Sequence, residues 1–192
     1  MSDLVLERTA TVANLLAAFE GESNAHSKYL SSAIKADAEG WHGAASRFRA
    51  AARAEEIHAN NHARVLRQLG ADAKCQIHPA EVKSTLENLK AALTGERYEI
   101  DTMYPAFIAE ASAIDIPIAT RSFTWAMEAE KTHARLYAEA IELVEKGLED
   151  SWLASACNFY VCIACGYTTK TPEEQDRCPV FNLASDKFEV IR

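Results

Sequence analysis

The sequence predicts an all-α protein, a four-helix bundle, followed by a small cysteine-containing domain. Residues 1 to about 147 are rich in Ala, Glu, Leu, Lys and Arg and hold only three of the five Pro. Apolar residues recur there at steps of three and four, the spacing of one helix face. Four of the five Cys lie in the last 36 residues, beside short β-branched and aromatic runs. This change in composition predicts two domains, at 1–148 and 152–192.

Composition and charge exclude several classes of protein. The chain has 192 residues, of which 48% are hydrophobic and 25% charged, which is ordinary for a folded soluble protein. Its net charge of −8 argues against nucleic-acid binding. No apolar run approaches the ~18–20 residues of a membrane span. The N-terminal stretch MSDLVLERTA does not resemble a signal peptide, so we expect a cytoplasmic protein whose cysteines are thiols or metal ligands.

Helix start and stop signals divide the first domain into four long segments. Gly70 ends the second, and Pro79 is expected at the start of the third. Asp115 is expected to cap the fourth, with Pro117 in its first turn. The link between Gly70 and Pro79 is longer than a tight helical hairpin needs and could cross the length of the bundle. The expected helices cover 5–38, 42–69, 80–113 and 117–147.

Each inward-facing apolar stripe carries a carboxylate near its midpoint. Apolar residues stand on both sides of these acids, as expected for helix faces that meet in a core. Burying several carboxylates together is very unfavourable unless cations compensate. Carboxylate oxygens and imidazole nitrogens suit iron or manganese. The acids are Glu22, Glu55, Glu96 with Glu99 one turn later, and Glu130.

Two of the four helices repeat the pattern Glu-x-x-His, as Glu55 with His58 and Glu130 with His133. Residues at i and i+3 lie on one helix face and can reach one metal. A single such pair is typical of a solvated face, but two pairs with matching acids on the other helices predict a pseudo-symmetric site for two metals. His62 lies closest to this stripe without such a partner, and we expect it to be a packing histidine.

The motifs resemble those of the rubrerythrin family along essentially the whole chain. The stretches that carry the resemblance are FEGESNAHSKYL, RAEEIHA, GERYEIDTMYPAF, AEKTHARLY and YVCIACGY. The resemblance implies a ferritin-like four-helix bundle with a small C-terminal rubredoxin-like domain. It also implies two non-haem iron ions that reduce hydrogen peroxide to water, in protection against oxidative stress.

The resemblance also assigns roles to individual residues. Glu22 is implied as a terminal ligand, and Glu55 and Glu130 as carboxylates that bridge the two irons. In the family one iron moves between a carboxylate and a histidine when the redox state changes, and these correspond to Glu99 and His58. The remaining implied ligands are Glu96 and His133. The resemblance also implies three catalytic groups beside the metals, namely Glu99, Tyr29 and Tyr104. Each tyrosine would also suit an aromatic core. Pro105 is expected to loosen the third helix and to shape the wall of the site.

The C-terminal segment matches three of the four sulfur ligands of a rubredoxin-like iron site. These are Cys162, Cys165 and Cys178, whereas Phe181 stands at the fourth position. Three alternatives remain: iron or zinc held by three thiolates with another ligand, no metal, or recruitment of Cys157. A domain of ~40 residues usually depends on its metal for folding. We therefore expect the tail to be held by docking against the bundle or a partner subunit.

Three functions are compatible with these observations. The first is a peroxide reductase that takes electrons from a donor protein, either rubredoxin or an NAD(P)H-dependent reductase, and that forms a homodimer as the resemblance implies. The alternative is a ferritin-like ferroxidase or iron-handling protein, which would take up iron beyond two ions per chain. The third is an interaction module that retains metal without activity.

Overall fold

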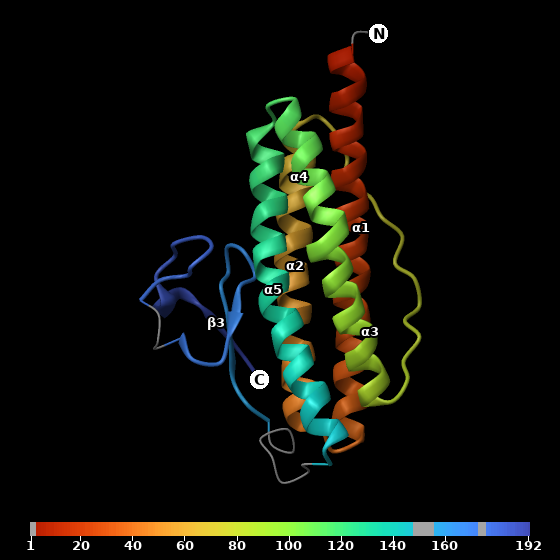
Figure 1. Cartoon of the computed structure of the whole chain (residues 1–192), viewed down its shortest axis with the longest axis vertical. Helices are drawn as coiled ribbons and strands as arrows, with labels where there is room; N and C mark the ends of the chain where they lie inside the picture. Colours follow the sequence, from red (N-terminus) through yellow and green to blue (C-terminus); the bar gives the residue numbers. More distant parts are fainter. Residues whose placement is uncertain (1–2, 148–155, 173–175) are drawn as a thin grey trace.

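The computed structural model describes residues 3–147, 156–172 and 176–192. Four long helical segments lie side by side, and a small three-stranded sheet packs against one side of them (Figure 1). This confirms the predicted ferritin-like bundle with a small C-terminal unit. The segments are α1 (Asp3–Ala38), α2 (His42–Gln68), a third segment built of three pieces, and α5 (Pro117–Glu145).

The third segment differs from the single helix expected at 80–113. It begins at Thr85, because Ser84 and Glu87 form a reciprocal capping box with each other's backbone. It then runs through α3 (Thr85–Tyr98), the π-helix η1 (Glu99–Met103) and α4 (Tyr104–Ala113). The expected start at Pro79 was therefore wrong, since the capping signal lies five residues further on.

The π-helix explains how Pro105 is accommodated. Proline lacks the N–H that an α-helix needs, and it stands here in the first turn of α4. Just before it, the Tyr104 N–H donates to the Glu99 carbonyl, five residues back, which is the π pattern. The expected local distortion is confirmed, and it lies beside the two acids of this segment.

A long connection joins α2 to the third segment and runs along the outside of the bundle (Figure 1). Asn24 of α1 anchors it: its side-chain amide donates to the Gln76 carbonyl at 2.9 Å and accepts from the His78 N–H at 2.8 Å. The expected crossover is confirmed, although it extends to Ser84.

The turn before α5 differs from expectation in one respect. Asp115 does not cap the helix, because the residue at the N-cap is Ile116 and no side-chain cap forms. Asp115 instead adopts a left-handed conformation with φ 53°, which Asp tolerates better than most residues. Pro117 occupies the first turn of α5, as expected.

Two apolar clusters fill the bundle and leave a polar layer between them. One contains Tyr29, Phe48, Leu89 and Tyr137; the other contains Leu15, Leu66, Tyr104, Phe107 and Phe123. Full burial of each large side chain contributes about 1.5–3 kcal/mol. The buried acids and histidines lie in the layer between these clusters.

The C-terminal unit is a sheet of order β2-β1-β3 with antiparallel pairs. Its strands are β1 (Phe159–Val161), β2 (Thr168–Thr169) and β3 (Glu189–Ile191), and the short helix η4 (Ser185–Lys187) precedes β3. Phe159 and Val161 are fully buried against Ala50, Ala54 and Ile57 of α2 and Leu136 of α5. The C-terminal unit therefore docks on the bundle of its own chain, as one of the two expected arrangements. The predicted domain boundary falls largely on residues 148–155, outside the described ranges.

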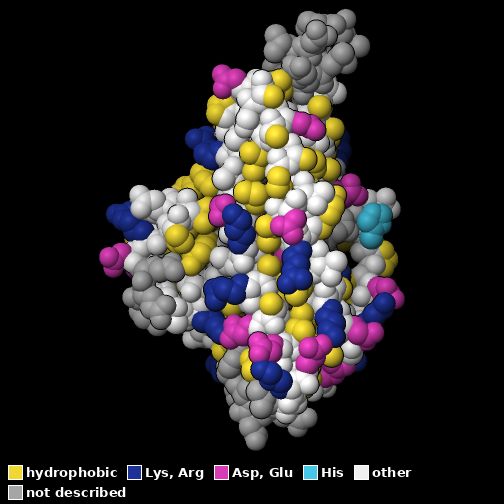
Figure 2. All heavy atoms as spheres, in the orientation of Figure 1, with side chains coloured by type: hydrophobic (Ala, Val, Ile, Leu, Met, Phe, Trp, Pro, Cys, Tyr) yellow, Lys and Arg dark blue, Asp and Glu magenta, His cyan; other side chains and the backbone are white. Residues whose placement is uncertain are grey.

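The surface carries charges of both signs. Figure 2 shows acidic and basic side chains interspersed over one face of the bundle. Within the described ranges, no helix is both long and apolar enough to cross a membrane.

Candidate metal centre

Two overlapping groups of carboxylates and imidazoles occupy the polar layer of the bundle. One contains Glu22, Glu55, His58 and Glu130, and the other contains Glu55, Glu96, Glu130 and His133. Within each group the candidate ligand atoms all lie within 4.8 Å of one another, and every member is buried. Glu55 and Glu130 belong to both groups, so each could contact two metals. The structure thus brings together the Glu and His residues that the pattern predicted on four helices, apart from Glu99.

Both imidazoles present the same nitrogen to the carboxylates. His58 Nδ1 lies 2.7 Å from Glu130 Oε1, and His133 Nδ1 lies 2.6 Å from Glu130 Oε2. His58 Nε2 donates to the Cys165 carbonyl at 2.9 Å, because a carbonyl can only accept. This contact keeps a proton on Nε2, so Nδ1, which faces the carboxylates, is the nitrogen at which a metal would replace a proton.

His133 is oriented by a similar contact from the C-terminal unit. Its Nε2 lies 3.2 Å from the Thr168 hydroxyl, and that hydroxyl donates to the Gly166 carbonyl at 2.9 Å. The Thr168 oxygen therefore accepts from His133 Nε2–H, and Nδ1, which faces Glu130, is again the nitrogen that a metal would bind. Sequence reasoning missed Thr168, because nothing in the pattern placed the tail over the bundle histidines.

The buried carboxylates are short of hydrogen-bond donors. Among the described residues, Glu22 Oε2 and Glu96 Oε2 have no hydrogen-bond partner, although both side chains are at most 1% exposed. A buried carboxylate oxygen without a donor or a cation is strongly unfavourable. Four buried acids and two imidazoles of this geometry fit two hard cations. The residues present therefore fit a di-iron centre.

The electrostatics agree with a need for added positive charge. Burial raises the pKa of Glu55 well above its usual value, and Glu130 and Glu22 raise it further. Burial also raises the pKa of Glu96, with Glu130 and Glu55 adding to the effect. Burial opposes charge on Glu130 too, but His58 and His133 hold its pKa well below the usual range. Protons and metal ions therefore compete for the same oxygens.

Two tyrosines hydrogen-bond to the outer acids of the groups. Tyr29 donates to Glu96 Oε1 at 2.7 Å, and Tyr104 donates to Glu22 Oε1. Both phenols are buried, and burial raises the pKa of each well above its ordinary value. Each phenol therefore keeps its proton and offers it to a carboxylate. The sequence placed both tyrosines near the centre, and the structure shows which acid each one contacts.

Glu99 lies at the start of the π-helix and is only half-buried. Burial raises the pKa of its carboxyl group, and the charges of Glu22 and Glu130 raise it further. It is not a member of either four-residue group. Glu99 is therefore an additional carboxylate beside the His58 side of the centre.

Three buried sulfurs form a second, separate cluster. Cys162, Cys165 and Cys178 lie with their Sγ atoms within 4.8 Å of one another. Hydrogen bonds from Cys162 and Cys165 lower the pKa of the Cys178 thiol. The Phe181 N–H also donates to Cys178 Sγ at 3.3 Å, a contact that favours a thiolate.

The two cysteine loops have the same backbone fold. In the first, Gly166 N donates to Cys162 O at 2.9 Å, and Cys162 N donates to Tyr167 O at 2.9 Å. In the second, Asn182 N donates to Cys178 O at 2.8 Å, and Cys178 N donates to Leu183 O at 2.7 Å. Gly166 and Asn182 have φ of 79° and 61°. Phe181 therefore occupies the position that Cys165 occupies in the first loop.

The fourth ligand position holds no sulfur. The Phe181 ring lies edge-on to the Trp125 ring at 4.7 Å, and Phe181 is 37% exposed. Cys157 does not belong to the three-sulfur cluster but packs beside Phe159, and its N–H donates to Ser46 Oγ. The suggested recruitment of Cys157 thus finds no support. The cluster does not fit an iron site of four thiolates.

The first cysteine loop closes over the metal centre at Gly166. A Cβ added to Gly166 would lie 2.3 Å from His58 Nε2, and Gly166 has φ 79°. Nearby, Asn61 Nδ2 donates to the Ala164 carbonyl at 2.9 Å. A side chain at position 166 would therefore displace the contact that orients His58.

We expect Gly166→Ala to loosen the C-terminal unit from the bundle. The left-handed backbone alone costs a residue with a Cβ about 1–2 kcal/mol, and the clash with His58 adds to it. Hydrogen exchange at the amides of β1 and β2 should become faster, and unfolding in urea should shift to lower concentration.

Gly40→Ala is the matched control for this prediction. Gly40 has φ 83°, but nothing lies within 4 Å of its added Cβ. It carries the same backbone strain without the clash, so exchange in β1 and β2 should stay slow. Equal acceleration in both variants would contradict the contact between Gly166 and His58.

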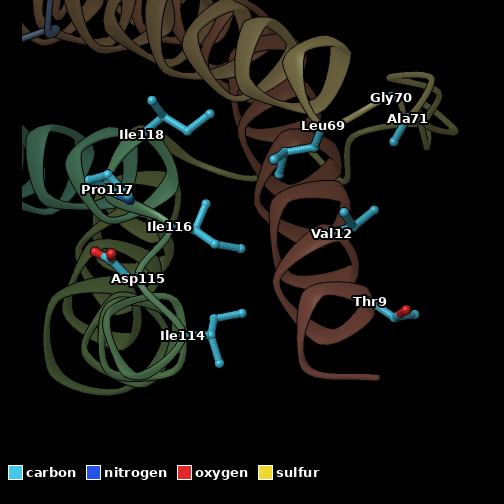
Figure 3. A pocket seen from close by; sticks show the side chains of 10 residues that line it. All are labelled: Thr9, Val12, Leu69, Gly70, Ala71, Ile114, Asp115, Ile116, Pro117 and Ile118. Carbon is cyan, nitrogen blue, oxygen red and sulfur yellow. The ribbon is translucent and has the colours of Figure 1, made fainter. Parts of the chain in front are cut away.

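A cavity of 890 Å³ lies between the N-terminal part of α1, the end of α2 and the turn before α5 (Figure 3). Its lining includes Val12, Leu69 and Ile116. Glu and His residues of the two groups do not line it. We therefore do not assign this cavity to the metal centre.

Comparison with known proteins identifies the family. The rubrerythrin family model matches residues 13–141. The chain belongs to the rubrerythrin family. Rubrerythrin-2 of Clostridium acetobutylicum is 34% identical over 92% of this chain and 94% of its own length. Nigerythrin of Nitratidesulfovibrio vulgaris is 33% identical over 93% of this chain and 85% of its own length.

Solved structures agree with this assignment. A structure of nigerythrin in a mixed-valent state has a TM-score of 0.84 and 32% identity, and the match covers 94% of this chain and 86% of that chain. A bacterioferritin from Desulfovibrio desulfuricans has a TM-score of 0.72 at 20% identity, covers 80% of this chain and 90% of that chain, and shows likeness of fold. As a member of the rubrerythrin family, the chain has a carboxylate–imidazole cluster that fits a di-iron site and a three-sulfur cluster at the position of a rubredoxin-like site.

Proposed function

We propose that this protein is a non-haem di-iron peroxidase that reduces hydrogen peroxide to water and protects the cell against oxidative stress. The observation that carries the proposal is the pair of overlapping ligand groups that share Glu55 and Glu130. Each group offers one imidazole and three carboxylates to one metal. Iron bound there would supply two electrons and two Lewis-acidic cations that hold both oxygens of the substrate.

The chain's own groups are suited to holding such a centre. Glu22 and Glu96 are the proposed terminal ligands, and Glu55 and Glu130 the proposed bridges. The Nδ1 atoms of His58 and His133 complete the two groups, and each ring is oriented by the C-terminal unit through Nε2. Apolar clusters on both sides keep bulk water out of the polar layer.

Protons for water formation would come from groups beside the metals. Glu99 is half-buried, and burial together with the charges of Glu22 and Glu130 raises its pKa, which favours the protonated carboxyl group and suits it as a proton donor. Its position beside the His58 group supports the proposed exchange of one iron between Glu99 and His58. Tyr29 and Tyr104 hold further protons, which they donate in hydrogen bonds to Glu96 and Glu22.

Electron supply is proposed to come from outside the chain. The three-sulfur cluster does not fit a four-thiolate iron, so we derive no electron transfer through one. We propose that a donor protein, either rubredoxin or an NAD(P)H-dependent reductase, reduces the centre. We also propose a homodimer, for which the exposed Leu30 and Ile34 of α1 offer an apolar contact.

Mixing experiments distinguish this function from that of a ferroxidase. The iron-loaded protein would be reduced without oxygen and then mixed separately with hydrogen peroxide and with oxygen. We expect peroxide to oxidise the centre much faster than oxygen, and excess ferrous iron not to accumulate beyond the bound ions. Faster oxidation by oxygen, with continued uptake of iron, would instead establish the ferroxidase.

A further inference from the structure

A buried polar chain leads from Glu22 to α5 and includes a histidine that the proposed mechanism does not use. His62 follows His58 by one helical turn on α2 and is fully buried. Its Nε2 lies 3.2 Å from the Tyr104 hydroxyl, and its Nδ1 lies 2.9 Å from the Ser122 hydroxyl. Tyr104 in turn donates to Glu22. Four elements thus supply one continuous chain of hydrogen bonds.

The direction of every hydrogen bond in this chain is fixed by chemistry. The carboxylate of Glu22 accepts, so the single proton of Tyr104 points to Glu22. The Tyr104 oxygen must then accept from His62, which places a proton on Nε2. Burial lowers the pKa of His62 to about 3, so the ring is neutral and Nδ1 has no proton. Nδ1 therefore accepts from the Ser122 hydroxyl.

The surroundings of His62 favour a directional role over simple packing. Its ring lies 5.5 Å from Phe123 and 6.0 Å from Tyr104 in an otherwise aromatic and aliphatic cluster. Burying an imidazole there without both hydrogen bonds would be unfavourable. Ser122 points its hydroxyl at His62, across the interface between α5 and α2. Both nitrogens of the ring are thus satisfied, and a leucine at position 62 would leave Tyr104 free to reorient.

We propose that His62, oriented by Ser122, is a positioning residue that keeps the Tyr104 proton directed at Glu22. The proposal rests on the proposed di-iron function, in which Glu22 is a ligand. When Nε2–H occupies the acceptor side of the phenol, the phenol cannot turn its proton away from the carboxylate. Glu22 therefore keeps one oxygen hydrogen-bonded and the other free for metal, and a proton stays ready beside the centre.

The first test concerns the tautomer of His62 and needs no activity. The full-length protein would be loaded with zinc, which is diamagnetic, and labelled with ¹⁵N in histidine. Nuclear magnetic resonance should show His62 as the neutral Nε2–H form, unchanged between about pH 5 and pH 9 because its folded pKa lies far below this range. A ring that carries its proton on Nδ1, or that is charged at neutral pH, would overturn the proposal even if the variants fail to fold.

The second test replaces His62 by Gln or by Asn, two side-chain amides that differ in length. In His62→Gln the side-chain nitrogen can take the place of Nε2 and donate to Tyr104; in His62→Asn it stops near the position of Nδ1. Loss of an outer hydrogen-bond partner typically costs about 10–100-fold. We expect peroxide to oxidise the reduced centre at least about tenfold more slowly in His62→Asn than in His62→Gln, with equal iron content. Equal rates in the two variants would contradict a directional role.

A double substitution shows whether His62 acts through Tyr104. Tyr104→Phe removes the proton altogether, so adding His62→Asn to it should slow the reaction no further. Additive losses would contradict the proposed route. The tautomer is measured without peroxide, so it stays decisive if the protein proves to prefer oxygen and the proposed function fails.

Discussion

Glu130→Ala is expected to lose both metal ions and to lower peroxide reduction by more than about 100-fold. Loss of an outer hydrogen-bond partner already costs about 10–100-fold, and Glu130 is a proposed ligand shared by both sites. Its two oxygens lie 2.7 Å from His58 Nδ1 and 2.6 Å from His133 Nδ1, so one carboxylate organises both imidazoles. The other acids of the two groups already contribute to them, and Glu99 belongs to neither group.

The loss of metal should also appear in thermal unfolding. A ligand present at about 100 times its dissociation constant stabilises a protein by about 2.7 kcal/mol, so added ferrous iron should raise the melting temperature of the wild type. It should leave that of Glu130→Ala unchanged. Elemental analysis of the purified proteins gives the metal content directly.

Two controls separate this effect from general damage. Glu128→Ala removes an acid from the same helix, but Glu128 is paired at the surface with Lys131 at 2.6 Å, so both metals should remain. Cys178→Ala should also leave the di-iron content unchanged, because its sulfur belongs to the separate cluster. If Glu130→Ala kept its metals, or if Cys178→Ala lost them equally, the assignment of two independent sites would be wrong.

The groups that form the candidate centre could be predicted because helix periodicity is a strong constraint. Glu55 and His58 lie three residues apart, so their position on one face follows from helix geometry alone. The same holds for Glu130 and His133, and burying these charges together requires cations. Each inward apolar stripe carries an acid near its midpoint, so packing the four stripes together brings the acids close to one another.

Features that depend on tertiary contacts could not be predicted in the same way. The third helix starts at Thr85 because Ser84 and Glu87 cap it, a local signal that competed with Pro79. The π-helix precedes Pro105 and the buried Tyr104, and the sequence predicted a distortion there but not its type.

Contacts between elements distant in sequence were also out of reach. His62 carries no partner in its own helix, and its role depends on Ser122, 60 residues later. The orientation of His58 depends in the same way on Cys165, 107 residues later. Sequence periodicity identifies which face of a helix is buried. It does not identify which atom of another element contacts that face.

Phe181→Cys is expected to create an iron site in the C-terminal unit. The two cysteine loops share the same hydrogen bonds, and Phe181 stands where Cys165 stands in the first loop, so the backbone for a fourth thiolate is already present. The substitution should add about one iron per chain and the red colour of ferric iron bound by thiolates. A complete metal site also supports folding, so amides of β1 and β3 should exchange more slowly.

Phe181→Ser is the matched control, because it removes the aromatic ring from Trp125 without supplying a thiolate. If the ring only blocks a site that three sulfurs can fill, both variants should gain metal equally. If the missing sulfur is the limiting feature, as the equivalence of the two loops indicates, only Phe181→Cys should gain the iron and the colour. A Phe181→Cys protein with the spectrum and metal content of Phe181→Ser would show that the second loop does not direct its side chain at the other three sulfurs.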